Sequence, residues 1–245
     1  MTFSYNAVWD DTGRLLKAHG PLLAAIAGVF VFLPTLLLGH FFPTPDLGAV
    51  DPALQAQVFR RFLKDSVMWY VLHSFIVMIG VAAMLRLALG PRTTVAGAIM
   101  FGGALLAPYS ILVVLTNIIV FIGALLLIVP GLYLWARMLP AGAAMVAEDR
   151  RNPVDALKRS FALTSGSGWA VLGLLLLVAI PGMVLVLAVR MVSGILFILA
   201  AGQQTGTLLT EIVYCALVTI FIVILTMLSA AIYRALAGPD LKKPA

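Results

Sequence analysis

Long apolar runs that are almost free of charge constrain this chain more than any other feature. Six runs approach or exceed the about 20 residues that a membrane-spanning helix needs; they cover residues 21–42, 67–89, 104–129, 132–147, 169–189 and 208–231. Of all 245 residues, 62% are hydrophobic and 11% are charged, whereas a soluble domain is about a quarter charged. The sequence therefore predicts an all-α integral membrane protein with six transmembrane helices plus short amphipathic interfacial helices, and it excludes a soluble or disordered chain.

Polar segments flank the apolar runs and divide the chain into three predicted parts. Residues 1–20 form an interfacial N-terminal helix, residues 21–238 form the six-span membrane domain, and residues 239–245 form a polar tail. The first apolar run is longer than the about 7–15 apolar residues of a cleavable signal peptide, so we expect it to be retained as a span. In the N-terminal helix, Val8 and Leu15 lie seven residues apart on one face, which is the amphipathic pattern of a helix at a membrane surface.

Two dipeptides mark the expected starts of further helices. Asp51-Pro52 and Asn152-Pro153 each combine an N-cap side chain with a proline suited to the first helical position. The first opens a short amphipathic helix ahead of the second span, and the second opens a helix over residues 153–164. In that helix Lys158 and Arg159 lie beside an apolar face, which suits contact with anionic lipid headgroups. The alternative is a loop helix that only orders the turn between two spans.

The basic residues orient the chain. With six spans, eleven of the 16 Lys and Arg residues fall on the side of the termini, and Arg60, Arg61 and Lys64 fall on the other. Because basic residues gather in cytoplasmic loops, both termini are predicted to be cytoplasmic. The net charge of +6 follows from the same rule, and without a basic domain outside the membrane we expect no nucleic-acid binding.

Four ionisable residues stand out within or at the end of the apolar runs, where a charge costs several kcal/mol and is a functional hypothesis by default. These are Arg137, Arg190, His73 and Glu211. With cytoplasmic termini all four fall in the outer half of the membrane, so we expect one polar layer in which Glu211 pairs with one arginine and the other holds a phosphate or carboxylate. The alternatives are structural: a salt bridge, an arginine that snorkels to the interface, or a packing histidine. Asn117 is expected to join helices rather than to bind a ligand.

Sequence signatures of catalysis and of metal or cofactor binding are missing. There is no His-Glu-x-x-His, Gly-x-Ser-x-Gly or P-loop motif, and the one cysteine, Cys215, builds neither a disulfide framework nor a thiolate metal site. We therefore expect no enzymatic activity, no metal and no cofactor; an intramembrane enzyme would need a site that these motifs do not cover. Pro130-Gly131 and Pro181-Gly182 each precede an Arg-Met pair, which leaves an internal repeat open.

Residues 128–173 carry a family resemblance. Pro130-Gly131 precedes a tyrosine-bearing run with Arg137 inside it and Glu148 at its end, followed by Ala156-Leu157, Ser160, Leu163-Thr164, Gly166 and Trp169. This pattern resembles the multi-pass membrane domain that accompanies some bacterial glycerophosphodiester phosphodiesterases and also occurs alone, as in YciC-like inner-membrane proteins. The catalytic barrel of those enzymes is missing from this sequence, so their activity is not implied. What the resemblance implies is a bacterial inner (cytoplasmic) membrane and a lipid-related setting.

Together these observations predict a non-enzymatic inner-membrane protein that binds or transports a lipid or another anionic amphiphile. Arg137, Arg190, His73 and Glu211 are the predicted headgroup-binding residues. The alternative is an assembly or scaffolding subunit that stabilises another membrane complex. Membrane lipids are the expected partners, and a homo-oligomer or a membrane-protein partner is left open.

Overall fold

The structure is a computed structural model that describes residues 3–45, 48, 50–91 and 93–238; the predicted polar tail at 239–245 lies outside them. The described part is all-helical, with 89% of the chain in helices and no strand. Four helical stretches in it are long and apolar enough to cross a membrane: Tyr5–Phe41, Pro52–Leu89, Leu106–Leu126 and Gly168–Ala237. The predicted all-α fold with apolar helices of membrane-spanning length is confirmed at this level.

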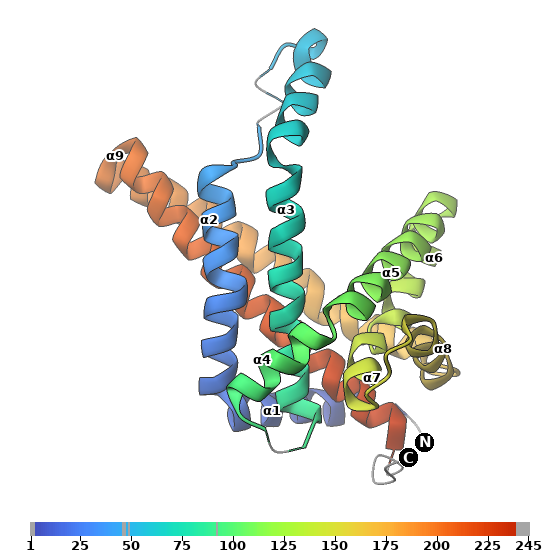
Figure 1. Ribbon diagram of the computed structural model, residues 1–245. Helices are drawn as coiled ribbons and strands as arrows, with labels where there is room; N and C mark the ends of the chain where they lie inside the picture. Colours follow the sequence, from blue (N-terminus) through green and yellow to red (C-terminus); the bar gives the residue numbers. More distant parts are fainter. Residues whose placement is uncertain (1–2, 46–47, 49, 92, 239–245) are drawn as a thin grey trace.

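The N-terminal stretch runs across the base of the molecule and then turns upright (Figure 1). Helix α1 (Tyr5–Ala27) continues through a π-helical turn (Gly28–Phe32) into α2 (Leu33–Phe41). Pro21 lies inside α1, where its missing N–H and its ring favour a bend. The lying and the upright parts of this stretch are therefore one continuous helical path.

The predicted interfacial helix uses its apolar face to pack on the protein. Val8 and Leu15 are buried, and α1 lies against α9 (Gly168–Ala237). An ion pair supports this contact, because Asp11 Oδ2 lies 3.4 Å from Arg234 Nε near the end of α9. The apolar face that the sequence assigned to the membrane surface therefore packs against another helix of the same chain.

Helix α3 (Pro52–Leu89) is one continuous helix, where the sequence predicted a short amphipathic helix followed by a separate span. The predicted cap is confirmed, since the Asp51 side chain accepts a hydrogen bond from the Ala53 N–H at 2.9 Å. No Gly or Pro occurs between Pro52 and Gly80, so nothing interrupts the helix. At about 1.5 Å per residue, its 38 residues extend about 57 Å, well beyond the about 30 Å of a hydrocarbon core.

The next three helices make two close helix–helix contacts. Helix α4 (Val95–Ala104) packs on α3, and α5 (Leu106–Leu126) pairs with α6 (Ile128–Met138). The chain was predicted to break at Pro130-Gly131, but it breaks at Leu127, whose extended backbone (φ −161°, ψ 150°) ends α5. Pro130 is instead accommodated in the first turn of α6, where it forfeits no intrahelical hydrogen bond.

Two short helices follow at the base of the molecule. The predicted span at 132–147 is split at Leu139-Pro140 into α6 and α7 (Ala141–Ala147), because the proline begins a new helix. Helix α8 (Pro153–Leu163) starts where predicted, with the Asn152 side chain accepting from the Val154 N–H at 3.0 Å. Both contact α9 (Gly168–Ala237) at the base (Figure 1).

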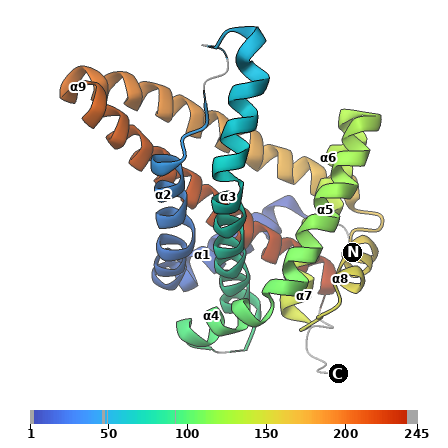
Figure 2. The same cartoon turned by 45° about the horizontal axis from the view of Figure 1, so that its top comes forward.

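Helix α9 folds back on itself as a long hairpin. Gly202 adopts φ 77°, ψ 172°, a conformation open to glycine because it has no Cβ. The two arms then run side by side, as both views show (Figures 1 and 2). They approach closely just after the turn, where a Cβ on Gly206 would lie 2.6 Å from the Ile198 backbone. The predicted loop at 202–206 is thus reduced to a single turn residue.

The buried core lies at the base, and the other ends of the hairpins diverge (Figure 2). Buried residues concentrate at 82–85 of α3, 143–146 of α7 and 227–233 of α9. Toward the free ends, large apolar side chains such as Leu126 and Leu199 are exposed, as suits surfaces that face lipid. The base therefore fixes the arrangement, and the free ends carry surface available to other molecules.

We predict that Gly131→Ala loosens the α5–α6 hairpin. A Cβ on Gly131 would lie 2.8 Å from Ala124 Cα, so the backbones must separate, at a cost of about 1–3 kcal/mol. The thermal unfolding midpoint in detergent should fall accordingly. Gly103→Ala is the matched control, since a Cβ there meets nothing within 4 Å; equal midpoints for the two variants would contradict this packing.

Candidate functional site

The free end of the α9 hairpin carries an ion pair that joins its two arms. Arg190 Nη2 donates to Glu211 Oε1 at 3.0 Å. The guanidinium carbon also lies 4.3 Å from the centroid of the Tyr214 ring, a cation–π contact. The two charges lie on opposite sides of the turn at Gly202, so the pair fixes the arms to each other within an otherwise apolar segment.

Helix α2 brings His73 to the same region. A Cβ on Gly39 would lie 3.8 Å from Glu211 Oε2, and Thr35, one helical turn earlier, lies 3.0 Å from His73 Nε2 through its Oγ1. The Thr35 hydroxyl donates its one proton to the Val31 carbonyl at 2.6 Å. It must therefore accept from His73, which places the imidazole proton on Nε2 and leaves Nδ1 as the second ring site.

We call Arg190, Glu211, His73 and Thr35 the distal cluster. Of the four predicted headgroup residues, Arg190 and Glu211 contact each other directly, and Glu211 and His73 each approach one face of α2, at Gly39 and Thr35. The shared face follows from the spacing of Thr35 and Gly39, which lie four residues apart and so on one side of the helix. The three predicted residues come from α3 and from both arms of α9.

A groove of about 570 Å³ opens beside the ion pair. Its polar lining consists of Arg190, Glu211, Thr207 and Thr210, and the rest is apolar: Met191, Gly194, Ile195, Ile198 and Leu199. The side chain of Arg190 is 45% exposed and that of Glu211 is 28% exposed, so both charges reach the groove. A second hollow, of about 590 Å³, lies between α2 and α3 and is apolar except at His73.

Arg137 lies elsewhere, at the base, and does not share a layer with the distal cluster. Its Nη2 donates to the Phe161 carbonyl at 2.6 Å and its Nε to Thr164 Oγ1 at 3.1 Å. The guanidinium carbon lies 4.7 Å from the centroid of the Phe161 ring. Arg137 thus occupies the C-terminal end of α8, where a cation meets helix carbonyls left without intrahelical donors. The expectation of one layer assumed an unbroken span through 132–147, and the break at Leu139-Pro140 removes that premise.

Glu148 is the centre of a polar network at the base. Its carboxylate accepts from Arg159 Nε at 2.8 Å, from Tyr233 Oη at 2.9 Å and from Arg150 Nε. Burial opposes ionisation, but the hydrogen bonds from Arg159, Arg150 and Tyr233 outweigh it and hold the Glu148 pKa below its ordinary value. Of the two predicted headgroup contacts on α8, Arg159 is therefore engaged with Glu148, and Lys158 is exposed.

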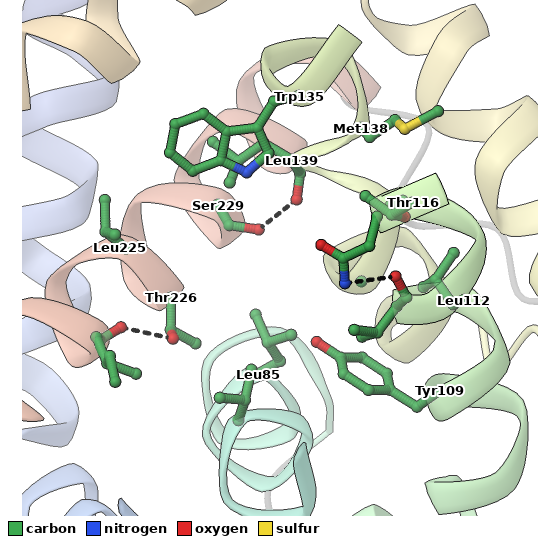
Figure 3. Close-up of a pocket in the computed structure, with 16 residues that line it drawn as sticks. Leu85, Tyr109, Leu112, Thr116, Trp135, Met138, Leu139, Leu225, Thr226 and Ser229 are labelled. Carbon is green, nitrogen blue, oxygen red and sulfur yellow. Dashed lines mark hydrogen bonds between the residues drawn. The ribbon is translucent and has the colours of Figure 1, made fainter. Parts of the chain in front are cut away.

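A central cavity also lies between α3, α5, α6, α7 and α9 (Figure 3). Its polar lining includes Tyr109, Trp135, Thr116, Asn117 and Ser229, residues that the sequence did not assign to a site. Asn117 was expected to join two helices, but it donates to the Val113 carbonyl in its own helix at 2.9 Å. The signal that could have found this cavity is the presence of polar-ended aromatic side chains within the apolar runs.

The described residues contain no group of three His, Cys, Asp or Glu side chains arranged to hold a metal ion. Cys215 is buried. No family model, curated protein or solved structure matches the chain. The resemblance of residues 128–173 to the multi-pass domain stays a prediction, and the function is argued from the distal cluster itself.

We predict that Glu148→Gln lowers the free energy of unfolding at neutral pH by about 1–2 kcal/mol. This is the usual contribution of hydrogen bonds to a charged group, reduced because both arginines are partly exposed to solvent. Because the folded pKa is depressed, this stabilisation is present above the ordinary pKa and is lost as the pH falls through the folded value. The midpoints of wild type and variant should therefore begin to converge as the pH falls below the ordinary glutamate pKa of about 4.3.

Thermal unfolding in detergent between about pH 3 and pH 8 measures this convergence. Asp65→Asn is the control, since Asp65 lies 3.9 Å from Arg61 in an exposed pair and should have little effect at any pH. A Glu148→Gln deficit that is constant across the whole range would show that the carboxylate charge contributes nothing.

Proposed function

We propose that this is a non-enzymatic membrane protein that binds or transports a lipid or another anionic amphiphile, with the headgroup at the distal cluster. The observation that supports it is the exposure of Arg190. A guanidinium in an apolar helix is normally turned toward a protein interior or a water-filled cavity. This one is 45% exposed in a groove whose other end is apolar.

The chemistry of the groove matches an amphiphile. Arg190 has five N–H donors, and Glu211 takes one of them, so the remaining fork is free to bind a phosphate in a bidentate way. The apolar residues Ile195, Ile198 and Leu199 then offer a surface to an acyl chain. Glu211 limits the affinity for a bare anion and keeps the site charge-neutral when empty.

The finer membrane arrangement is part of this proposal. We propose six crossing segments: the upright part of α1–α2, α3, α5, the α6–α7 path and the two arms of α9. Both termini are cytoplasmic in a bacterial inner membrane, as the basic residues and the family resemblance favour. The distal cluster then lies in the outer half of the bilayer, and the Glu148 network lies at its cytoplasmic face.

We predict opposite effects for the two members of the ion pair. Arg190→Gln should reduce the anionic phospholipid that co-purifies with the protein in mild detergent by about tenfold, since it removes the charge-assisted contacts. Glu211→Gln should retain at least as much lipid as wild type, because it frees the arginine. Lipid mass spectrometry of the purified variants measures both, with Arg60→Gln as the control for loss of an exposed arginine elsewhere.

The scaffolding alternative makes a different prediction for the same proteins. The N-terminal end of α3 favours this alternative. Leu54, Phe59 and Leu63 are exposed there, and if this end of the helix protrudes from the bilayer, lipid does not cover them. On that alternative a stable protein partner co-purifies and Arg190→Gln retains it. Unchanged lipid in Arg190→Gln, together with such a partner, would overturn the lipid-binding proposal.

The six-segment arrangement is tested at the two hairpin turns. In a Cys215→Ala background, Leu127→Cys and Gln203→Cys should both react with a membrane-impermeant maleimide from outside intact cells, and Asp149→Cys should react after permeabilisation only. The α5–α6 turn is the sharper case, because Leu126, Leu127 and Ile128 are all apolar and exposed. If Leu127→Cys is labelled from neither side, this hairpin turns inside the bilayer and only four segments cross completely.

A further inference from the structure

We propose a second binding site in the central cavity, for an uncharged and largely apolar molecule that carries a carbonyl oxygen. The cavity has a volume of about 330 Å³, near the lower end of ligand pockets. It lies between α3, α5, α6–α7 and the returning arm of α9, and none of the distal-cluster residues lines it. The proposal is therefore independent of the function proposed for that cluster.

The lining excludes a charged ligand. The 16 residues around the cavity include no Asp, Glu, Lys, Arg or His. A charge bound there would have no counter-ion in a region of low dielectric constant, which is strongly unfavourable. Leu85, Leu112 and Met138 form much of the buried wall, so most of the ligand must be apolar.

One polar group points into the cavity without a partner. Tyr109 is 8% exposed, and its hydroxyl points toward the middle of the cavity (Figure 3). Among the described residues, neither this hydroxyl nor the Trp135 indole N–H nor the Thr116 hydroxyl makes a hydrogen bond, and none of the three atoms is sealed off from contact. These groups line the cavity and are therefore free to donate to an acceptor that a ligand supplies.

The other polar side chains of the lining are already engaged. Ser229 donates to the Leu139 carbonyl at 3.0 Å, and Thr226 donates to the Ile222 carbonyl at 2.7 Å. Of the groups left over, the Trp135 indole N–H can only donate, whereas the hydroxyls of Tyr109 and Thr116 can donate or accept. A carbonyl oxygen, with two lone pairs and no proton, matches them better than a ligand that must itself donate.

The shape of the cavity depends on a glycine and has an open side. A Cβ on Gly142 would lie 2.8 Å from Tyr109 Oη, so a larger residue at position 142 would push the tyrosine hydroxyl out of its present position. Asn117 is exposed and lines the cavity, which marks a route from the surrounding bilayer. A membrane-soluble molecule with a ring carbonyl, as in a quinone, or with an ester carbonyl, as in a glyceride, has the required chemistry.

The test uses a full-length variant in which Trp135 is the single tryptophan, with Trp9, Trp69 and Trp169 replaced by phenylalanine. Its fluorescence in detergent is titrated with decylbenzoquinone, with 1,2-dioctanoylglycerol and with dodecane, which has no acceptor. We expect a saturable change with at least one carbonyl compound. Tyr109→Phe should weaken that binding about five- to tenfold by removing one buried hydrogen bond.

Tyr5→Phe is the matched control, because it removes a hydroxyl outside both the cavity and the distal cluster, and it should leave the affinity unchanged. Saturation by the quinone alone or by the glyceride alone supports the site and identifies the source of the carbonyl. The proposal is overturned if neither binds, if dodecane binds equally well, or if Tyr109→Phe has no effect. Native mass spectrometry of the unmodified chain and of Tyr109→Phe with the same compounds decides the question if the single-tryptophan variant does not fold.

Discussion

The carboxylate of Glu148 joins the parts of the chain on which the rest of the structure depends. It follows α7 directly, binds Arg159 of α8 and accepts from Tyr233 near the end of α9. Tyr233 is fully buried, so its hydroxyl needs this acceptor. The free ends of the hairpins diverge, and their positions are therefore set by how the helices leave this base. Arg137 at the end of α8 and the Asp11–Arg234 pair strengthen the same region.

The lack of water in a bilayer explains why the charges divide between two regions. A charge inside the hydrocarbon must find a partner or a polar surface, and the base provides both for Arg137 and Glu148. Among the described residues, Arg190 and Glu211 have only each other, the Tyr214 ring and an open groove as polar surroundings. Their incomplete enclosure is the observation on which the lipid-binding proposal rests.

Sequence reasoning predicted the class of fold and several local features, because these depend on composition and on neighbouring residues. Apolar runs, the caps at Asp51 and Asn152, and a pairing of Glu211 with an arginine all follow from such information. The position of Arg137 did not, because its depth was counted along a run that Pro140 divides. The central cavity was missed because Tyr109 and Trp135 lie on different helices, and only their tertiary packing makes them neighbours.

The distal cluster is tested most directly by an experimental structure of the protein in nanodiscs of bacterial phospholipid. The account predicts headgroup density within hydrogen-bonding distance of the Arg190 guanidinium and acyl-chain density along Ile195 and Ile198. Arg190 enclosed between helices, with no lipid density beside it and with the groove filled by the protein's own side chains, would contradict it.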